Sequence, residues 1–189
     1  MENLQLKLER LAKESEQELK QMGFGPQMNK RLYYRLSNAK RRLGQCEANK
    51  RDINISKWLL EVGSDKDIKN CIIHEILHTF DDTCGHKGMW KVYARRVNSY
   101  GIYNITTTTD VDAIMKNNNI PQDKALEMRG KRYEITCLGC GMVMYQNKIN
   151  SRTLNGFKAG NRYHVPCKSH NFKIVDLQTN EILVNKEEK

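Results

Sequence analysis

The sequence predicts an α+β fold, in which a domain of helices and a small sheet is followed by a small β module. Three observations support this fold class: apolar residues at helical spacing near the start, short alternating segments typical of strands, and later cysteine pairs flanked by strand-like segments. We expect the α+β domain over residues 1–115, a linker over 116–130, the β module over 131–180 and a tail over 181–189.

The first elements are one amphipathic helix and several strands. The helix is predicted by apolar residues in a charged background, and Gly23–Pro26 ends it. Strand-like segments follow at 31–36 and 42–46, and residues 52–56 alternate apolar and polar side chains. The apolar positions of the helix are Leu4, Leu8, Leu11, Leu19 and Met22.

The most informative segment is the pentapeptide HEILH, which spans His74 to His78. Two histidines four residues apart on a helix point to one side, where each can offer a neutral ring nitrogen to one metal ion. Glu75 lies three residues before His78, so its carboxylate flanks the same face and can accept a proton instead of ligating the metal. The pattern therefore predicts a catalytic zinc site with Glu75 as the general base.

His86 is the candidate third ligand and lies in the segment GHKGMW, residues 85–90. Three protein ligands with an open fourth position are typical of a catalytic zinc ion. Some zinc peptidases use a later glutamate instead, but residues 87–126 contain none. Asp81, Asp82 and Cys84 compete for the metal in this pattern. We interpret the two aspartates as capping or ligand-supporting groups and Cys84 as a small buried residue.

A second group of ligand-type residues begins with Cys137 and Cys140 and returns with Cys167 and His170. Each pair is separated by two residues, and four such ligands close a tetrahedral structural zinc site. His164 is the alternative fourth ligand, and we prefer His170 because its spacing from Cys167 mirrors the first pair. So small a module has little core, and a zinc ion would supply much of its folding free energy. We expect two zinc ions, one catalytic and one structural.

Positive charge is concentrated in two regions of a chain whose net charge is +10. Residues 30–58 contain nine Lys/Arg and two acidic residues, and residues 131–175 contain eight Lys/Arg and one acidic residue. Localised positive charge with aromatic residues between is typical of a nucleic-acid-binding surface. We expect residues 155–160 to form a loop whose phenylalanine is exposed and able to stack on a base. The candidate nucleic-acid contacts are Lys148, Arg152, Phe157, Lys158 and Arg162.

Composition also bears on the compartment and the partners. The chain begins with polar and acidic residues and contains no apolar run that approaches a membrane span, so we expect a cytoplasmic protein without a membrane partner. Three of the six cysteines are assigned to the β module, and we expect reduced thiols rather than disulfides. We expect a monomer that acts on a protein substrate.

Taken in order, the amphipathic helix, the strands, HEILH, GHKGMW and the cysteine pairs resemble the SprT-like zinc metallopeptidases, relatives of the Spartan proteases that digest proteins crosslinked to DNA. The resemblance covers residues 1–115 for the peptidase domain and 131–176 for a zinc ribbon that often follows it. It implies a minimal zincin-type fold, with zinc held by the three histidines and Glu75 as the base. Two departures stand out: Lys87 delays the glycine after His86 by one position, and the ribbon ends in His170 instead of a fourth cysteine.

The sequence thus predicts a zinc-dependent metalloendopeptidase acting on DNA-associated proteins, with single- or double-stranded DNA as a partner. In zinc peptidases a strand placed like residues 52–56 often offers its edge to the substrate backbone, and we expect the same here. The alternative is a nucleic-acid-binding accessory or regulatory protein whose peptidase site is silent or specific for one partner. The intact Glu75 argues against a silent site, because a purely structural site has no use for a carboxylate at that position.

Overall fold

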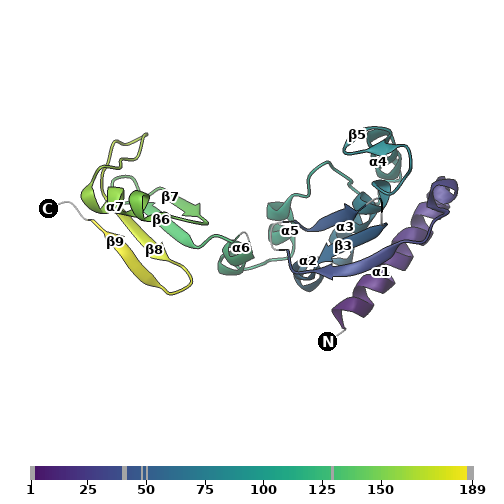
Figure 1. Ribbon diagram of the computed structural model, residues 1–189, viewed down its shortest axis with the longest axis horizontal. Coiled ribbons are helices and arrows are strands. Elements are labelled where there is room, and N and C mark those ends of the chain that lie inside the picture. The colour runs from purple at the N-terminus through teal and green to yellow at the C-terminus, as the bar shows by residue number, and fades with distance from the viewer. Residues whose placement is uncertain (1–2, 40–41, 48, 50, 129, 187–189) are drawn as a thin grey trace. The chain divides into compact units, whose positions relative to one another are not determined.

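The computed structural model describes residues 3–39, 42–47, 49, 51–128 and 130–186. Three residues of the predicted basic region and the end of the predicted tail lie outside the described residues; these are Lys40, Arg41, Lys50 and residues 187–189. The chain divides into two compact units, Met1–Pro121 and Gln122–Lys189 (Figure 1). In the part of the chain that is described, no helix combines the length and apolar character needed to cross a membrane.

The first unit combines helices with a three-stranded sheet. Its helices are α1 (Leu4–Leu19), the π-helix η1 (Lys20–Phe24), the 3-10 helix η2 (Gly25–Met28), α2 (Lys57–Val62), α3 (Asp65–Leu77), α4 (Met89–Ser99) and α5 (Val111–Asn117). Its strands are β1 (Tyr33–Ser37), β2 (Gly44–Glu47), β3 (Asp52–Ser56), β4 (Thr83–Cys84) and β5 (Lys87–Gly88). The side chain of Asn3 caps α1, and Leu8 and Leu11 are fully buried, which confirms the predicted amphipathic helix.

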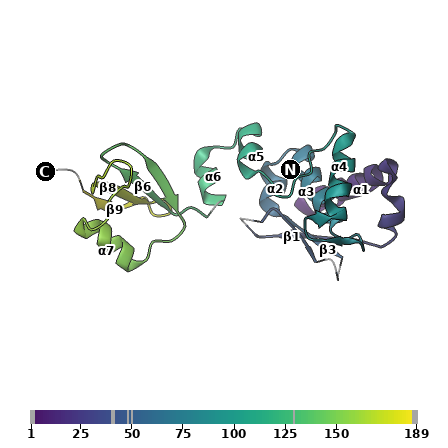
Figure 2. The same cartoon turned by 90° about the horizontal axis from the view of Figure 1, so that it is seen from above.

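One face of the sheet forms the core of this unit. Ile53 and Ile55 of β3 are fully buried, whereas Asp52 and Asn54, which alternate with them, are only partly covered. α1 packs on β1, α3 packs on β2 and β3, and the two helices pack on each other. Figure 2 shows these helices on one side of β1 and β3. The HEILH helix is therefore held between the sheet and α1 by apolar burial.

The strand order is β1-β3-β2, so β3 is the central strand of the sheet. It pairs in parallel with β1 and antiparallel with β2, and both of its edges are occupied. The expectation that residues 52–56 offer an edge to a substrate is therefore wrong, because side-chain alternation identifies a strand but not its neighbours. Among the described residues β2 is an edge strand, and its Gly44 and Cys46 lie opposite Ile55 and Ile53 on the core side.

The second unit is built on an antiparallel sheet with the strand order β7-β6-β8-β9. Its elements are α6 (Gln122–Met128), β6 (Tyr133–Cys137), β7 (Val143–Gln146), α7 (Ser151–Ala159), β8 (Phe172–Asp176) and β9 (Glu181–Asn185). The expected linker, 116–130, thus contains the end of α5 and all of α6. Residues 181–185, expected to be part of a tail, instead pair with β8, and Val184 is buried. Val184 and the partly buried Leu183 are adjacent and do not alternate with polar residues, so this short strand left too weak a pattern to recognise.

Helix α7 replaces the exposed loop that we expected at residues 155–160. Asn150 caps its start, and Gly160, with φ of +75°, ends it in the left-handed conformation. The ring of Phe157 is partly buried and packs edge-on against Phe172 of the core of this unit, with centroids 4.8 Å apart. The expectation of an exposed Phe157 is therefore wrong, because the helical backbone turns this side chain toward the sheet.

Candidate metal centres

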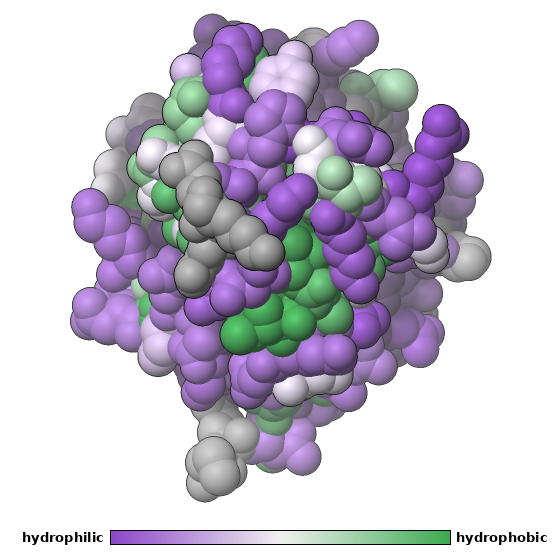
Figure 3. All heavy atoms as spheres, turned by 90° about the vertical axis from the view of Figure 1, so that its left-hand side faces the viewer, coloured by the Kyte–Doolittle hydropathy of each residue, from purple (hydrophilic) through white to green (hydrophobic). Residues whose placement is uncertain are grey.

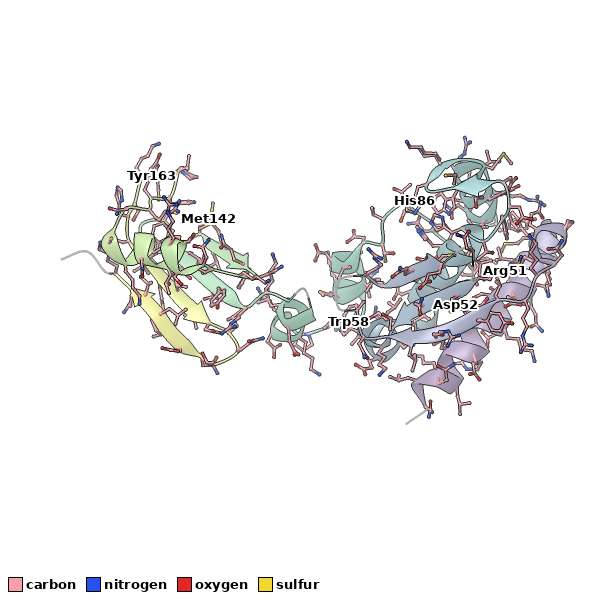
Figure 4. All side chains as sticks on the ribbon, in the orientation of Figure 1. Arg51, Asp52, Trp58, His86, Met142 and Tyr163 are labelled. Atoms are coloured by element: carbon pink, nitrogen blue, oxygen red, sulfur yellow. The ribbon has the colours of Figure 1, made fainter. Side chains whose placement is uncertain are left out.

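Three histidine rings of the first unit converge on one point, which can be found from His86 in Figure 4. The Nε2 atoms of His74 and His78 lie 3.3 Å apart, those of His78 and His86 3.0 Å, and those of His74 and His86 2.9 Å. A tetrahedral ion with Zn–N distances of about 2.0–2.1 Å spaces its nitrogen ligands about 3.3 Å apart. The three rings brought together here therefore fit the ligand set of one zinc ion.

Two elements carry these histidines. His74 lies in the last turn of α3, which begins with a capping box at Ser64, and His78 is the C-cap residue of the same helix. His86 lies in the turn between β4 and β5. The hydroxyl of Thr83 lies 3.0 Å from the carbonyl oxygen of Leu77, the last residue of the helix, and 2.7 Å from that of Phe80 in the following turn, which fixes the start of the hairpin. The hairpin can therefore bring a third ring to the two on the helix.

The hairpin also depends on two glycines. Gly85 and Gly88, on either side of His86 and Lys87, have φ of +56° and +51°. Residues with a Cβ rarely adopt this left-handed conformation, whereas glycine does so at little cost. The tight return of the chain at His86 therefore requires glycine at these positions.

Trp90 of α4 lies against all three histidine rings. Its indole stacks on His78 at an interplanar angle of 23° and meets His74 and His86 edge-on, with centroids 4.9 and 4.7 Å away. The side chain is buried, and its Nε1–H has no hydrogen-bond partner among the described residues. This rigid wall restricts the rotation of the rings. Sequence reasoning gave Trp90 no role, although its place in GHKGMW was the available signal.

The three rings are neutral and correctly oriented to ligate a cation. Nδ1–H of His74 donates to the carbonyl oxygen of Thr106 over 2.9 Å, which leaves the lone pair of Nε2 facing the other rings. Burial lowers the pKa of His74 to about 4, and repulsion from the charges that His78 and His86 would carry if protonated acts in the same direction. Burial and the charge of His86 lower the pKa of His78 to about 4, and burial lowers the pKa of His86. Neutral imidazole is the form that binds zinc.

Glu75 is 7% exposed and lies next to His74 in the chain. Burial raises the pKa of its carboxyl to about 7, against the opposing effects of the Arg42 charge and a hydrogen bond from the backbone N–H of Cys46. The carboxylate packs against β2 at Gly44. A carboxyl with a pKa near neutrality can accept and release a proton at neutral pH. This environment suits a general base.

The competing ligands lie outside the group of three histidines. Asp81 forms an ion pair with Lys30 at 2.6 Å, and Asp82 accepts a hydrogen bond from the hydroxyl of Tyr93 at 2.5 Å. The two aspartates therefore hold neighbouring segments together instead of capping the helix or supporting a ligand. Cys84 is exposed, contrary to expectation, because it lies in a two-residue strand of the hairpin.

A pocket of about 670 Å³ lies beside His74. Asn70 and Cys71 of α3 form one wall, and residues of the 104–110 loop and of α5 form the others. The volume is within the range of ligand pockets, and hydroxyl and amide groups make up much of the lining. The pocket therefore leaves room for a polar bound molecule next to His74, a proposed ligand of the metal.

A second group of ligand atoms lies in the second unit and consists of Cys137, Cys140, His164 and Cys167. The Sγ atoms of Cys137 and Cys167 lie 3.5 Å apart, and Nδ1 of His164 lies 3.3 Å from Sγ of Cys140 and 3.1 Å from Sγ of Cys167. A tetrahedral ion with Zn–S distances of about 2.3 Å spaces sulfur ligands about 3.8 Å apart. Three thiols and one imidazole fit a closed, structural site.

His164 rather than His170 completes this group, which corrects our preference for His170. Each is separated from Cys167 by two residues, so the spacing could not distinguish them. The backbone N–H of Lys168 donates to the carbonyl of His164 at 2.7 Å and closes a turn that brings His164 to Cys167. Lys168 has φ of +58°, and beyond it Nδ1 of His170 donates to the carbonyl of Gly160 at 2.8 Å. Turn geometry therefore selects the ligand.

The candidate nucleic-acid contacts lie along α7 and its flanks, but Phe157 among them is partly buried against the core of the unit. Arg152 and Lys158 belong to α7, Lys148 precedes it and Arg162 follows it. A Cβ atom at Gly156 would lie 3.2 Å from Nε of Arg162, so this arginine packs back onto the helix. The four basic residues therefore share one region of the second unit.

Tyr163 is the exposed aromatic residue beside them. It is 51% exposed, and the amino group of Lys168 lies 5.4 Å from its ring centroid. Figure 4 shows Tyr163 and Met142 at the same end of the unit. Figure 3, which faces this unit, shows a hydrophobic patch within a largely hydrophilic surface. Large exposed hydrophobic side chains of the unit include Leu138, Met142, Val143, Tyr163 and Val165.

Comparison with known proteins identifies the first unit. The family model described as the SprT-like family matches residues 9–110, more than half of the chain. The matched range includes the three histidines, Glu75 and Trp90. No curated protein matches the chain.

Proposed function

Because the chain belongs to the SprT-like family, we propose that it is a zinc-dependent metalloendopeptidase whose active site is the group of three histidines. The observation that carries this proposal is the convergence of three neutral imidazole nitrogens next to a buried glutamate. Three ligands leave one position of a tetrahedral ion open for substrate and water. Family membership supports a metallopeptidase-type hydrolase, and the donor set supports zinc.

In this mechanism His74, His78 and His86 hold the metal and Glu75 moves the proton. A bound zinc ion would supply Lewis-acid polarisation of the scissile carbonyl and of the attacking water. Glu75 accepts a proton from that water and delivers it to the leaving amine, for which its raised pKa is suited. Trp90 keeps solvent from one side of the rings and limits their rotation.

The substrate, in this proposal, binds as an extended segment along β2. An edge strand presents unpaired N–H and C=O groups, to which a peptide can add as a further strand. Among the described residues β2 lies at the edge of the three-stranded sheet, its Gly44 lies against Glu75, and the N–H of Cys46 donates to that carboxylate, so a peptide added along this strand would lie beside the base. The polar pocket beside His74 leaves space for a substrate side chain.

The second unit, we propose, holds a structural zinc ion and binds DNA, so that the substrates are DNA-associated proteins. The support is the excess of Lys/Arg over acidic residues in 131–175, the four basic residues along α7, and the exposed ring of Tyr163. Lysine and arginine neutralise phosphates, and an exposed aromatic ring can stack on an unpaired base.

The substitution Glu75→Gln tests the peptidase proposal. Glutamine keeps the size of the side chain but cannot act as a base, so cleavage of an unfolded protein substrate should fall by about 10²–10⁴-fold while zinc content stays the same. Glu61→Gln, an exposed change on α2, is the matched control. Normal cleavage by Glu75→Gln would refute the assignment of the base. A zinc-loaded wild type that cleaves nothing, with or without DNA, would support the silent-site alternative.

DNA binding is tested by fluorescence anisotropy with single- and double-stranded oligonucleotides over a range of salt. Replacing Arg152 and Lys158 by alanine should weaken binding and reduce the slope of log K against log salt by about one for each lost phosphate contact. Lys20→Ala, on the first unit, is the control. Equal slopes for all three proteins would exclude this surface as the DNA-binding site.

A further inference from the structure

Three consecutive residues after α4, Asn104–Thr106, are each held by one polar side chain. The Oδ1 atom of Asn70 accepts a hydrogen bond from the N–H of the first residue at 3.0 Å. The carboxamide of Asn98 bonds both the N–H and the C=O of the second, at 2.6 and 2.9 Å. The C=O of the third accepts the hydrogen bond from Nδ1–H of His74 at 2.9 Å. Each of these three residues is therefore fixed by a hydrogen bond, and the third is bonded to the proposed metal ligand His74.

The two asparagines come from the two helices that flank this loop. Asn70 lies four residues before His74 on α3, so it belongs to the same face of the helix, one turn away. Asn98 lies near the end of α4, the helix that also carries Trp90. The position of the carbonyl that orients His74 is thus fixed relative to both helices of the site.

A fixed carbonyl decides which nitrogen of His74 carries the proton. With the proton on Nδ1, the lone pair of Nε2 faces His78 and His86 and is available to a metal. If the carbonyl moved away, the ring could rotate or carry its proton on Nε2, where it would oppose metal binding. The orientation of a histidine ligand by its second nitrogen is commonly worth about 10–100-fold in metal affinity.

We propose that Asn98, together with Asn70, is a positioning residue of the three-histidine site: the two carboxamides hold the Thr106 carbonyl where it fixes the tautomer and orientation of His74. The role of His74 as a metal ligand in this inference rests on the proposed function. The competing explanation is that apolar burial of Tyr103 and Ile105, which are 6% and 4% exposed, fixes the loop without the asparagines.

The experiment compares Asn98→Ala, Asn70→Ala and Asn104→Ala in the full chain. Asn104→Ala is the matched control, because it removes an asparagine side chain from the same loop while keeping the backbone N–H that Asn70 binds. The first measurement uses NMR of the histidine rings in the zinc-loaded protein to monitor the exchange of the His74 Nδ1–H with solvent. The second is the zinc affinity of each site, measured by competition with a chelator.

The proposal expects faster exchange of the His74 Nδ1–H in Asn98→Ala and a zinc affinity lower by about 10–100-fold at the three-histidine site only. The cysteine-containing site of the second unit should keep its affinity and serves as the internal control. Asn70→Ala should shift both quantities in the same direction by less, and it carries the test if Asn98→Ala does not fold. Slow exchange and unchanged affinity in a folded variant would overturn the proposal in favour of apolar anchoring.

Failure of the proposed function has a different signature. If the wild type binds no zinc at the three histidines, the peptidase proposal fails. The tautomer of His74 in the zinc-free chain then still tests the positioning role of Asn98 and Asn70, because the hydrogen bond to Thr106 does not need the metal. A proton on Nδ1 in the wild type and a mixture of tautomers in Asn98→Ala would support this positioning role. Identical histidine spectra of the two proteins would reject it.

Discussion

Gly44 of β2 lies directly against the carboxylate of Glu75. A Cβ atom built on Gly44 would lie 2.5 Å from Oε1 of Glu75 and 2.7 Å from Sγ of Cys71. Two residues further along the strand, the backbone N–H of Cys46 donates to the same carboxylate. Strand β2 therefore leaves space for the carboxylate of the proposed base at Gly44 and binds it by a hydrogen bond at Cys46.

The substitution Gly44→Ala should impair catalysis by displacing Glu75. The added methyl group has to push the carboxylate or the strand by several tenths of an ångström, and overpacking of this kind costs about 1–3 kcal/mol of stability. We expect kcat to fall by about 10–100-fold with zinc content unchanged, because small misplacements of catalytic groups are costly. Steady-state kinetics with urea unfolding measures both effects.

Gly25→Ala is the control for this substitution. A Cβ atom at Gly25 meets no heavy atom within 4 Å, and this glycine has an ordinary helical conformation. Its alanine variant should match the wild type in kcat, although its stability should fall slightly, because a residue with a Cβ before Pro26 disfavours the helical conformation. Equal kcat for Gly44→Ala and Gly25→Ala would contradict the view that β2 positions the base.

Zinc stoichiometry should distinguish His164 from His170. His164→Ala removes one of four converging ligand atoms, so bound zinc should fall from two ions to one in each chain. His170→Ala removes a hydrogen bond to the Gly160 carbonyl and a ring contact with Tyr163, but no converging ligand atom, and should keep both ions. Elemental analysis of the purified variants is the measurement. Loss of zinc from His170→Ala alone would show that the turn at Lys168 rearranges on metal binding.

Trp90 should report on metal binding at the three histidines. The chain has two tryptophans, Trp58 and Trp90, and only Trp90 is described in contact with these rings. In a Trp58→Phe background, adding Co²⁺ to zinc-free protein should quench the fluorescence, because the ion would lie within a few ångström of the indole. The same titration of a variant that also carries His74→Ala should need much more Co²⁺. Indistinguishable titrations would place the metal elsewhere.

The stability of the second unit should depend on pH through Asp176. Hydrogen bonds from Arg132 at 2.7 and 2.9 Å lower the pKa of this carboxyl, against the opposing effect of its burial. Because the pKa of Asp176 is lower in the folded state, its carboxylate contributes stability that is complete above the pKa of the unfolded state, about 3.9. This stability is lost as pH falls through the pKa of the folded state. Asp176→Asn should therefore destabilise the unit by about 1–3 kcal/mol at pH 7 and by less in acid.

Urea unfolding of the wild type and Asp176→Asn at several pH values between neutrality and strong acid measures this difference. Asp123→Asn, at an exposed position in the first turn of α6, removes only a favourable interaction with the helix dipole and should change the unfolding free energy by less than about 1 kcal/mol. A difference between wild type and Asp176→Asn that stays constant down to strong acid would mean that the ion pair with Arg132 does not carry the effect.

Local patterns were sufficient for most of the first unit. HEILH and the apolar residues around it predicted a buried helix with two histidines on one side, and α3 has this form. The alternation of residues 52–56 predicted β3 because only one face of the sheet is buried. The same pattern could not give the strand order, which depends on pairing with residues distant in the chain, and so the edge strand was assigned incorrectly.

Predictions for the second unit were less successful because its elements are short. Phe157 was expected to be exposed because its neighbours are small and polar, yet a nine-residue helix turns its ring toward Phe172 and partly buries it. The choice between His164 and His170 depended on one backbone hydrogen bond and one left-handed residue, which leave no trace in the spacing of the ligands.

The sequence by itself determined the chemistry available to this protein: three histidines and a glutamate in one region, and cysteines with histidines in another. Residue types and short-range spacing are sufficient for this, because ligand chemistry belongs to the side chain and helical periodicity is local. Only the tertiary structure decided how these groups are held. Gly44 against Glu75, Trp90 against His74 and His78, and the Thr106 carbonyl on His74 each join residues that are 12 to 32 positions apart, and only the packing of the folded chain brings them into contact.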